Sequence, residues 1–245
     1  MTYCVGLKLD RGLVFMSDTR TNAGVDNVSV FKKMFTWEVP GERLLVLMTA
    51  GNLGTTQSVI AELDDHAKAA SKRKPHLLGV PSMYEAARLV GKTVLRVQED
   101  QGGGKTARGN SRFEASLILG GQIKGGEPRL YMIYPEGNFI EASDDTPFLQ
   151  IGETKYGRPI LVRAYDPQMP FDDAIKLLMV SFDSTIKANL SVDLPIDMQI
   201  YEEGSMRQGY TCRVERDDPY FGLISSGWGA ALRDAFHSLP KYQME

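Results

Sequence analysis

Short apolar stretches of the strand type open the chain, and apolar residues at helical spacing follow them. Residues 2–9 and 13–17 are rich in strand-forming side chains and flank the turn sequence DRG. This arrangement predicts a β-hairpin. Residues 32–39 and 43–50 form a second pair, and the segment 43–50, RLLVLMTA, is nearly all apolar. We expect that strand to be buried on both faces. The polar, glycine-containing residues 21–29 are expected to form a loop.

Two helices are predicted next, followed by further strands and helices. Apolar residues recur three or four positions apart from Val59 onwards and again over residues 82–98, which is the spacing of a helix with one buried face. A third helical region is expected near Thr154, a fourth over residues 170–190, and a short C-terminal helix over residues 230–237. The remaining strands are predicted at residues 111–120, 130–134, 148–152, 196–201 and 210–215.

The order of these segments is strands, two helices, strands, two helices, strands. Such blocks indicate helices that cover sheets in layers more than a regular βαβ alternation. The chain has 245 residues, with no internal repeat and no linker-like break, so we expect one domain over residues 1–245. Hydrophobic residues make up 42% and charged residues 24% of the chain, which excludes a largely disordered protein.

Charge and composition exclude several functional classes. The net charge is −3, whereas a general nucleic-acid binder is normally basic. No apolar run reaches the roughly 18 residues of a membrane-spanning helix, and the opening MTYCVGLKLD is not a secretion signal. We therefore expect a cytoplasmic protein with neither a nucleic-acid nor a membrane partner. Two cysteines cannot form a disulfide framework. No histidine has a partner at metal-ligand spacing, so no metal site is predicted.

Candidate chemistry begins at Met1-Thr2. Removal of a methionine that precedes a small residue exposes Thr2, which then carries a hydroxyl and a free α-amine on one residue. An α-amine has a pKa of about 7.7–8.0, so it can act as a base near neutral pH. Threonine with an N-terminal amine is a recognised nucleophile–base pair. Met-Thr alone is weak support, because many ordinary chains begin this way.

Three later segments are predicted to converge on Thr2. The first strand of a hairpin starts beside the end of the second, which brings Asp18 near Thr2. A lysine next to the α-amine, either Lys32 or Lys33, would keep the amine deprotonated through like-charge repulsion, and Asp18 would hold that lysine in place. Gly51 ends the apolar strand where a helix opens. Backbone N–H groups at such a point can form an oxyanion hole, and glycine permits a close approach.

Together these segments resemble a known family. Met-Thr, a hairpin, Asp-Thr-Arg, Lys-Lys and Thr-Ala-Gly at this spacing are similar to proteasome-type β subunits of the N-terminal nucleophile (Ntn) hydrolase superfamily. The opening MTYCVGLKLD, the segment SDTRTNAG and the length are most similar to the bacterial Anbu (ancestral β subunit) family. The resemblance covers most of the chain. It implies an α+β fold, a four-layer αββα sandwich in which helices flank two packed antiparallel sheets. It also implies self-association into a ring-like or open-spiral homo-oligomer.

The resemblance further implies hydrolysis of peptide amide bonds by acyl transfer, with no metal or organic cofactor. Thr2 would be the nucleophile and its α-amine the base. Asp18 and Lys33 would be the supporting pair, with Lys32 as the alternative lysine. Gly51 would donate its N–H to the oxyanion.

Other positions follow from the same resemblance. Arg20 matches an arginine that anchors the lysine–aspartate network. Proteasome subunits carry a Gly-Ser-Gly motif whose serine supports the N-terminal threonine, but residues 151–154 read Ile-Gly-Glu-Thr here. A second motif, Asp-x-x-Ser-Gly-Gly, is matched only loosely around Ser191, which is the remaining candidate for a supporting serine. The positions that match the substrate cleft are Thr21, Asn22 and Thr49.

Two other functions stay open. The same nucleophile would serve an amidase that acts on a small or modified peptide, and turnover of unfolded protein against short amides separates the two. A catalytically silent assembly subunit is the other alternative, motivated by the altered serine motifs. It predicts a retained Met1, or a Thr2 that resists electrophiles. An ATP-dependent unfoldase is not identified by the sequence.

Overall fold

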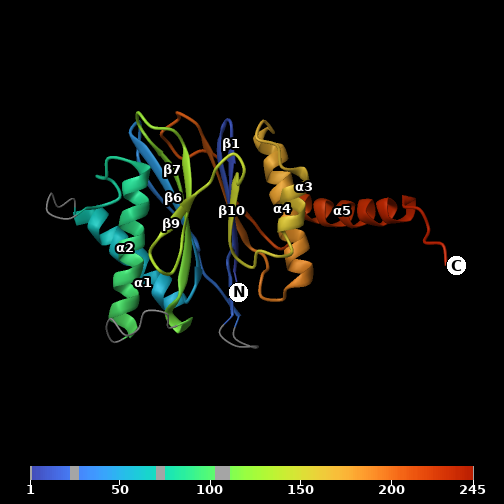
Figure 1. The fold of residues 1–245 in the computed structure, drawn as a ribbon, viewed down its shortest axis with the longest axis horizontal. Coiled ribbons are helices and arrows are strands. Elements are labelled where there is room, and N and C mark those ends of the chain that lie inside the picture. The colour runs from blue at the N-terminus through green and yellow to red at the C-terminus, as the bar shows by residue number, and fades with distance from the viewer. Residues whose placement is uncertain (1, 23–27, 70–74, 103–110, 245) are drawn as a thin grey trace.

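Two antiparallel sheets pack face to face between two layers of helices (Figure 1). The structure is a computed structural model and describes residues 2–22, 28–69, 75–102 and 111–244. Helices α1 and α2 cover one sheet, and α3 and α4 cover the other (Figure 1). The four-layer αββα sandwich implied by the sequence is therefore confirmed.

The first sheet carries the predicted hairpin at its centre. Strands β1 and β2 pair antiparallel, with Cys4 opposite Ser17. The sheet order is β10-β1-β2-β11-β12. Its strands are β1 (Tyr3–Leu9), β2 (Gly12–Asp18), β10 (Phe148–Gly152), β11 (Ile196–Glu202) and β12 (Thr211–Val214). The hairpin and the three later strands lie where the apolar patterns predicted them. Alternating strand-forming residues indicate both where a strand lies in the sequence and which of its side chains face each side of the sheet.

The second sheet has the order β5-β6-β7-β8-β9. Its strands are β5 (Met34–Val39), β6 (Arg43–Gly51), β7 (Ala115–Ile123), β8 (Arg129–Ile133) and β9 (Phe139–Glu141). Residues 111–113 form a 3-10 turn rather than the start of a strand, and β9 was not predicted because three residues carry too little periodicity. The expected loop at residues 21–29 is also partly wrong. It contains the paired strands β3 (Arg20–Asn22) and β4 (Val28–Val30).

Apolar side chains fill three separate layers. Alternate residues of β1 face opposite sides. Tyr3 and Val5 join the layer under α3 and α4, whereas Cys4 joins the layer between the sheets. In β6, Leu45 and Leu47 pack under α1 and α2 while Val46 faces the other sheet. The strand predicted to be buried on both faces is therefore buried on both.

Four of the five predicted helical regions are confirmed in position. The α-helices in the described part of the chain are α1 (Leu53–Ala69), α2 (Met83–Gly102), α3 (Arg158–Ala164), α4 (Phe171–Ala188) and α5 (Pro219–Ser238). The expected short helix at residues 230–237 is instead part of the 20-residue α5. It starts at Asp218, whose side chain accepts a hydrogen bond from the Phe221 amide, and at Pro219, both of which are helix-start signals.

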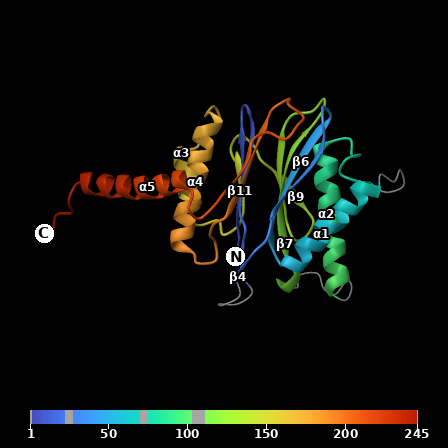
Figure 2. The same cartoon turned by 180° about the vertical axis from the view of Figure 1, so that it is seen from behind.

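Helix α5 extends from α4 away from the two sheets (Figures 1 and 2). Several of its large apolar side chains are consequently exposed, including Leu223 at 69% and Phe236 at 71%. None of the helices in the described part of the chain has the length and apolar character needed to cross a membrane.

Candidate active site

Thr2 lies immediately before β1, beside the end of β2. Because Cys4 is opposite Ser17 in the β1–β2 register, Asp18 lies next to Tyr3. Its Oδ1 accepts a hydrogen bond from the Tyr3 amide at 2.9 Å. The hairpin thus places Asp18 beside Thr2, as the sequence predicted from the geometry of a hairpin.

Lys33 joins these two residues. Its Nζ lies 2.8 Å from Thr2 Oγ1 and 2.9 Å from Asp18 Oδ1. A third acceptor, the carbonyl oxygen of Arg20, lies 2.5 Å from the same nitrogen. Lys33 is 4% exposed, whereas Lys32 is exposed. Of the two candidate lysines, Lys33 is the one that the structure brings to Thr2.

The carboxyl group of Asp18 is completely buried. Burial raises its pKa from 3.8 to about 6, and the positive charge and hydrogen bond of Lys33 oppose that shift. Its Oδ2 has no hydrogen-bond partner among the described residues. Asp18 therefore carries its negative charge above about pH 6 and in that state pairs with the Lys33 ammonium.

A cavity of about 350 Å³ opens in front of Thr2. The predicted residues Lys33, Thr21, Thr49 and Gly51 line it together with Thr2. Phe35 and Leu53 add apolar walls. Asn22 is the last residue of β3 and follows Thr21, and its side chain lies outside what the structure describes. The elements that meet at the cavity come from both sheets and from the start of α1.

Two glycines are required where the backbone approaches the site. Gly51 has a φ of +114°, and a Cβ there would lie 2.3 Å from the carbonyl oxygen of Glu114. Gly152 has a φ of +83°, and a Cβ there would lie 1.9 Å from the carbonyl oxygen of Thr2. Only glycine adopts such backbone angles without strain and leaves that space empty. Gly152 also lines the cavity, so it is a site residue that the sequence analysis did not assign.

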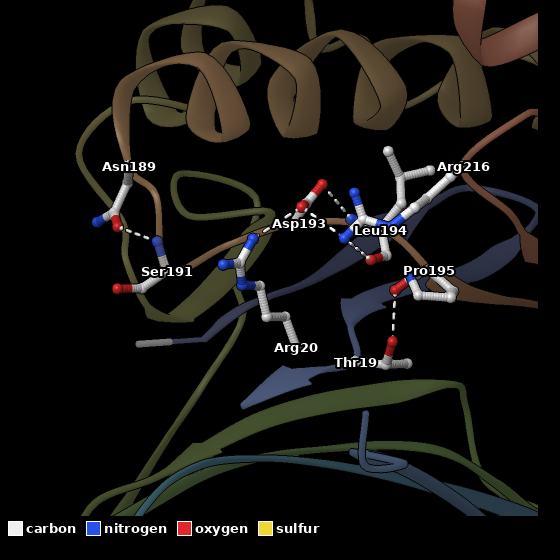
Figure 3. Close-up of polar contacts among 8 residues, drawn as sticks. All are labelled: Thr19, Arg20, Asn189, Ser191, Asp193, Leu194, Pro195 and Arg216. Atoms are coloured by element: carbon white, nitrogen blue, oxygen red, sulfur yellow. Dashed lines mark hydrogen bonds and ion pairs between the residues drawn. The ribbon is translucent and has the colours of Figure 1, made fainter. Parts of the chain in front are cut away.

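Glu153 is a second unassigned residue at Thr2. It is 8% exposed, and its amide donates to the Thr2 carbonyl oxygen at 2.6 Å. The side chain of Asn189 donates to Glu153 Oε2 at 2.9 Å. The predicted supporting residue Ser191 bonds through its amide to Asn189 Oδ1 at 2.9 Å (Figure 3). No described hydrogen bond joins Ser191 to Thr2. The available signal for Glu153 was its place in residues 151–154, the stretch that corresponds to the Gly-Ser-Gly motif of proteasome subunits.

Neither cysteine belongs to a metal site in the described chain. Cys4 is buried, whereas Cys212 is half-buried. Among the residues that the structure describes, no three histidine, cysteine, aspartate or glutamate side chains are grouped so that they could hold a metal ion.

Residues 2–200 match the proteasome subunit family. The chain belongs to the proteasome family. The match begins at Thr2 and includes all the strands whose residues line the cavity. The sandwich is therefore the Ntn-hydrolase fold, and the resemblance inferred from the sequence is confirmed at the level of the family.

Solved structures extend this similarity over the whole proteasome-family chain. Anbu (Gly-1) mutant from Hyphomicrobium sp. strain MC1 is 48% identical, with a TM-score of 0.92 and full coverage of both chains. Anbu (ancestral beta-subunit) from Yersinia bercovieri is 46% identical, with a TM-score of 0.92, and the match covers 99% of this chain and 100% of that one. The helical assembly of the Anbu complex from Pseudomonas aeruginosa is 48% identical, with a TM-score of 0.91 over 99% and 98% of the two chains. No curated protein matches the chain.

Proposed function

We propose that this protein is a single-domain threonine-type Ntn hydrolase that cleaves peptide amide bonds after Met1 has been removed. The observation that supports this most directly is the position of Lys33 Nζ, within 3 Å of both Thr2 Oγ1 and Asp18 Oδ1. A buried lysine in contact with a threonine hydroxyl favours loss of the hydroxyl proton, because its positive charge stabilises the developing negative charge on oxygen.

The reaction proceeds by acyl transfer. Thr2 Oγ attacks the substrate carbonyl carbon, and the hydroxyl proton passes to the Thr2 α-amine. The N–H of Gly51 stabilises the negative charge on the carbonyl oxygen. The α-amine then returns the proton to the leaving amine as the C–N bond breaks, leaving an ester on Thr2. Water hydrolyses that ester and restores the hydroxyl. No cofactor takes part in this scheme.

The cavity indicates which substrates fit. Lys32 and Lys33 are the charged residues that line it within the described part of the chain, and no carboxylate lines it there. An amide with an acidic or uncharged side chain beside the scissile bond is therefore favoured over one with a basic side chain. Thr21, Asn22 and Thr49 are proposed to bind the substrate backbone.

The test is the intact mass of the purified protein before and after treatment with a peptide epoxyketone or β-lactone. The expected result is a chain without Met1 that gains one adduct. Thr2→Ala should gain none. Thr56→Ala is the matched control, since it removes another hydroxyl that faces the same cavity. An adduct on Thr2→Ala, or a processed wild-type chain without an adduct, would contradict the proposal.

We also propose that the protein self-associates in the cytoplasm. The exposed apolar residues of α5 support this, because patches of that kind mark interaction sites. The Pseudomonas aeruginosa Anbu complex is described as a helical assembly. Replacing Phe236 with serine should lower the mass measured by light scattering after size-exclusion chromatography. Ser226→Ala, on the same helix, should leave that mass unchanged. An unaltered mass for Phe236→Ser would exclude this residue from the interface.

A catalytically silent assembly subunit is the second candidate. It is favoured by the described contacts of Ser191, which lead to Asn189 rather than to Thr2. For this candidate the mass experiment gives a processed chain without an adduct, while light scattering still gives an assembly. The two measurements together therefore separate the two candidates.

A further inference from the structure

The loop between α4 and β11 contains an aspartate that binds two arginines. Asp193 Oδ2 lies 2.8 Å from a guanidinium nitrogen of Arg20 and 2.7 Å from one of Arg216. Figure 3 shows both guanidinium groups converging on this carboxylate. The other oxygen, Oδ1, accepts a hydrogen bond from the Leu194 amide at 2.8 Å, which fixes the orientation of the carboxylate. One carboxylate thus neutralises part of the charge of two cations.

The same loop also holds the residue before Arg20. The carbonyl oxygen of Pro195 accepts a hydrogen bond from the Thr19 amide at 3.1 Å. It also accepts one from the Thr19 hydroxyl at 2.7 Å (Figure 3). Thr19 is completely buried. Residues 193–195 therefore fix the Thr19-Arg20 dipeptide twice, through the backbone of Thr19 and through the side chain of Arg20.

This dipeptide reaches the candidate active site through its backbone. The carbonyl oxygen of Arg20 accepts the 2.5 Å hydrogen bond from Lys33 Nζ. It is one of three acceptors around that nitrogen, and the other two are Thr2 Oγ1 and Asp18 Oδ1. A shift of the Arg20 backbone would therefore redirect the lysine relative to the threonine hydroxyl.

We infer that Asp193 is a positioning residue for Lys33, and that Arg216 completes the arrangement from the surface. Asp193 acts through Arg20, whose carbonyl oxygen it holds against the lysine ammonium, and it does not itself contact the reacting atoms. The inference rests on the proposed function, since a precisely placed Lys33 matters most if Thr2 is a nucleophile. Misplacing a catalytic group by about 1 Å can reduce a rate about a hundredfold.

The test compares rates of β-lactone labelling of Thr2 across a range of probe concentrations. Asp193→Asn should lower the maximal labelling rate about tenfold to a hundredfold and leave the probe concentration for half-maximal rate nearly unchanged, because the cavity walls stay in place. Asp197→Asn is the matched control. Its side chain is 15% exposed, against 16% for Asp193, and it also pairs with an arginine, but that arginine is Arg213. Asp197→Asn should label like the wild type.

Two more variants allow the inference to be refuted even if Asp193→Asn does not fold. Arg216→Gln removes an exposed partner and leaves the Arg20–Asp193 pair, so it should fold and lose only a few-fold in rate. Asp193→Glu keeps the charge and should recover part of the loss. Equal losses in Asp193→Asn and Asp197→Asn would overturn the inference, as would unchanged labelling of a folded Asp193→Asn. If Asp193→Asn does not fold, an unchanged rate in Arg216→Gln overturns it.

A wild-type protein that is not labelled at all contradicts the proposed function rather than this inference. Crystal structures of the wild type and Asp193→Asn then decide. A separation between Lys33 Nζ and the Arg20 carbonyl oxygen that grows by roughly 1 Å or more in the variant supports the positioning role. An unchanged separation overturns it.

Discussion

Three variants of the buried pair Lys33–Asp18 test separately what its charges contribute to the stability of the protein and to the reactivity of Thr2. Lys33→Met removes the cation, Asp18→Asn removes the anion, and the double variant removes both charges. The side chains are only 6% and 0% exposed, and their charged atoms lie 2.9 Å apart. We predict that each single variant is clearly less stable than the wild type, that the double variant recovers most of the loss, and that none of the three is labelled at Thr2.

The magnitudes follow from burial and distance. At 2.9 Å and an effective dielectric constant of about 20, the attraction between two unit charges is about 6 kcal/mol. Removing two ions from water costs several kcal/mol each, so the pair as a whole contributes little net stability. Removal of one partner leaves the other charge buried and unpaired, which typically costs about 3–5 kcal/mol. The double variant should therefore lie within about 1–2 kcal/mol of the wild type.

The pH dependence gives this prediction a definite sign. Lys33→Met removes the positive charge and the hydrogen bond that oppose the effect of burial, so the pKa of Asp18 rises above its wild-type value of about 6. The same carboxyl in the unfolded chain titrates at about 4. Between these two values the folded state binds a proton that the unfolded state does not, so stability increases as pH falls. Lys33→Met should be strongly destabilised at pH 8 and much less so at pH 5.

The assay is urea denaturation followed by tryptophan fluorescence, at one fixed protein concentration because self-association shifts apparent stability. Free energies of unfolding are compared for the wild type, both single variants and the double variant, at pH 8 and pH 5. The reasoning is refuted if Lys33→Met matches the wild type at pH 8, or if the double variant loses the sum of the two single losses. Additive losses would mean that the two charges do not interact.

Three further predictions concern the same region. The rate of β-lactone labelling of Thr2 should fall with decreasing pH as the Thr2 α-amine takes up a proton, and fall more steeply below about pH 6, where Asp18 takes up a proton; a single slope down to pH 5 would contradict the role of Asp18. Gly152→Ala should lower that labelling rate about tenfold or more, because its Cβ would overlap the Thr2 carbonyl oxygen. Gly41→Ala, at a φ of +76° with open space around it, should leave the rate unchanged. Equal effects of the two variants would assign the loss to backbone strain alone. Burial raises the pKa of the Cys4 thiol, so peptide mass mapping should find it alkylated by iodoacetamide only after denaturation, and reaction in the native state would show that the strand opens.

Local patterns in the sequence were sufficient to predict that Asp18 and Gly51 belong to the candidate site. A hairpin closes over a few residues, so the alternation of residues 2–9 and 13–17 and the turn between them already placed Asp18 beside Thr2. Gly51 could be predicted in the same way, because it ends a nearly all-apolar strand just before α1 begins. In each case the deciding contacts join residues that are close in the sequence or share one element.

The choice between Lys32 and Lys33 was decided only by tertiary structure. Adjacent residues of an extended chain point in opposite directions, and the residues 23–27 that precede them carry no pattern that fixes which of the two faces Thr2. Gly152 and Glu153 reach Thr2 through the pairing of β1 with β10. That pairing joins segments about 150 positions apart in the sequence, and strand patterns do not specify which strands become neighbours.

The full length of helix α5 and the role of Asp193 were missed for the same physical reason. The apolar residues of α5 do not follow one buried face, since most of the helix extends beyond the sheets and leaves them exposed. Asp193 is a single acidic residue in a loop, and its position has meaning only through Arg20 and Arg216, which come from opposite ends of the chain. The sequence determined most of the helices and strands and the local neighbours of Thr2, because those depend on short-range periodicity and turns. The tertiary structure decided which distant backbone and charged groups surround it, because those depend on how the sheets and loops pack.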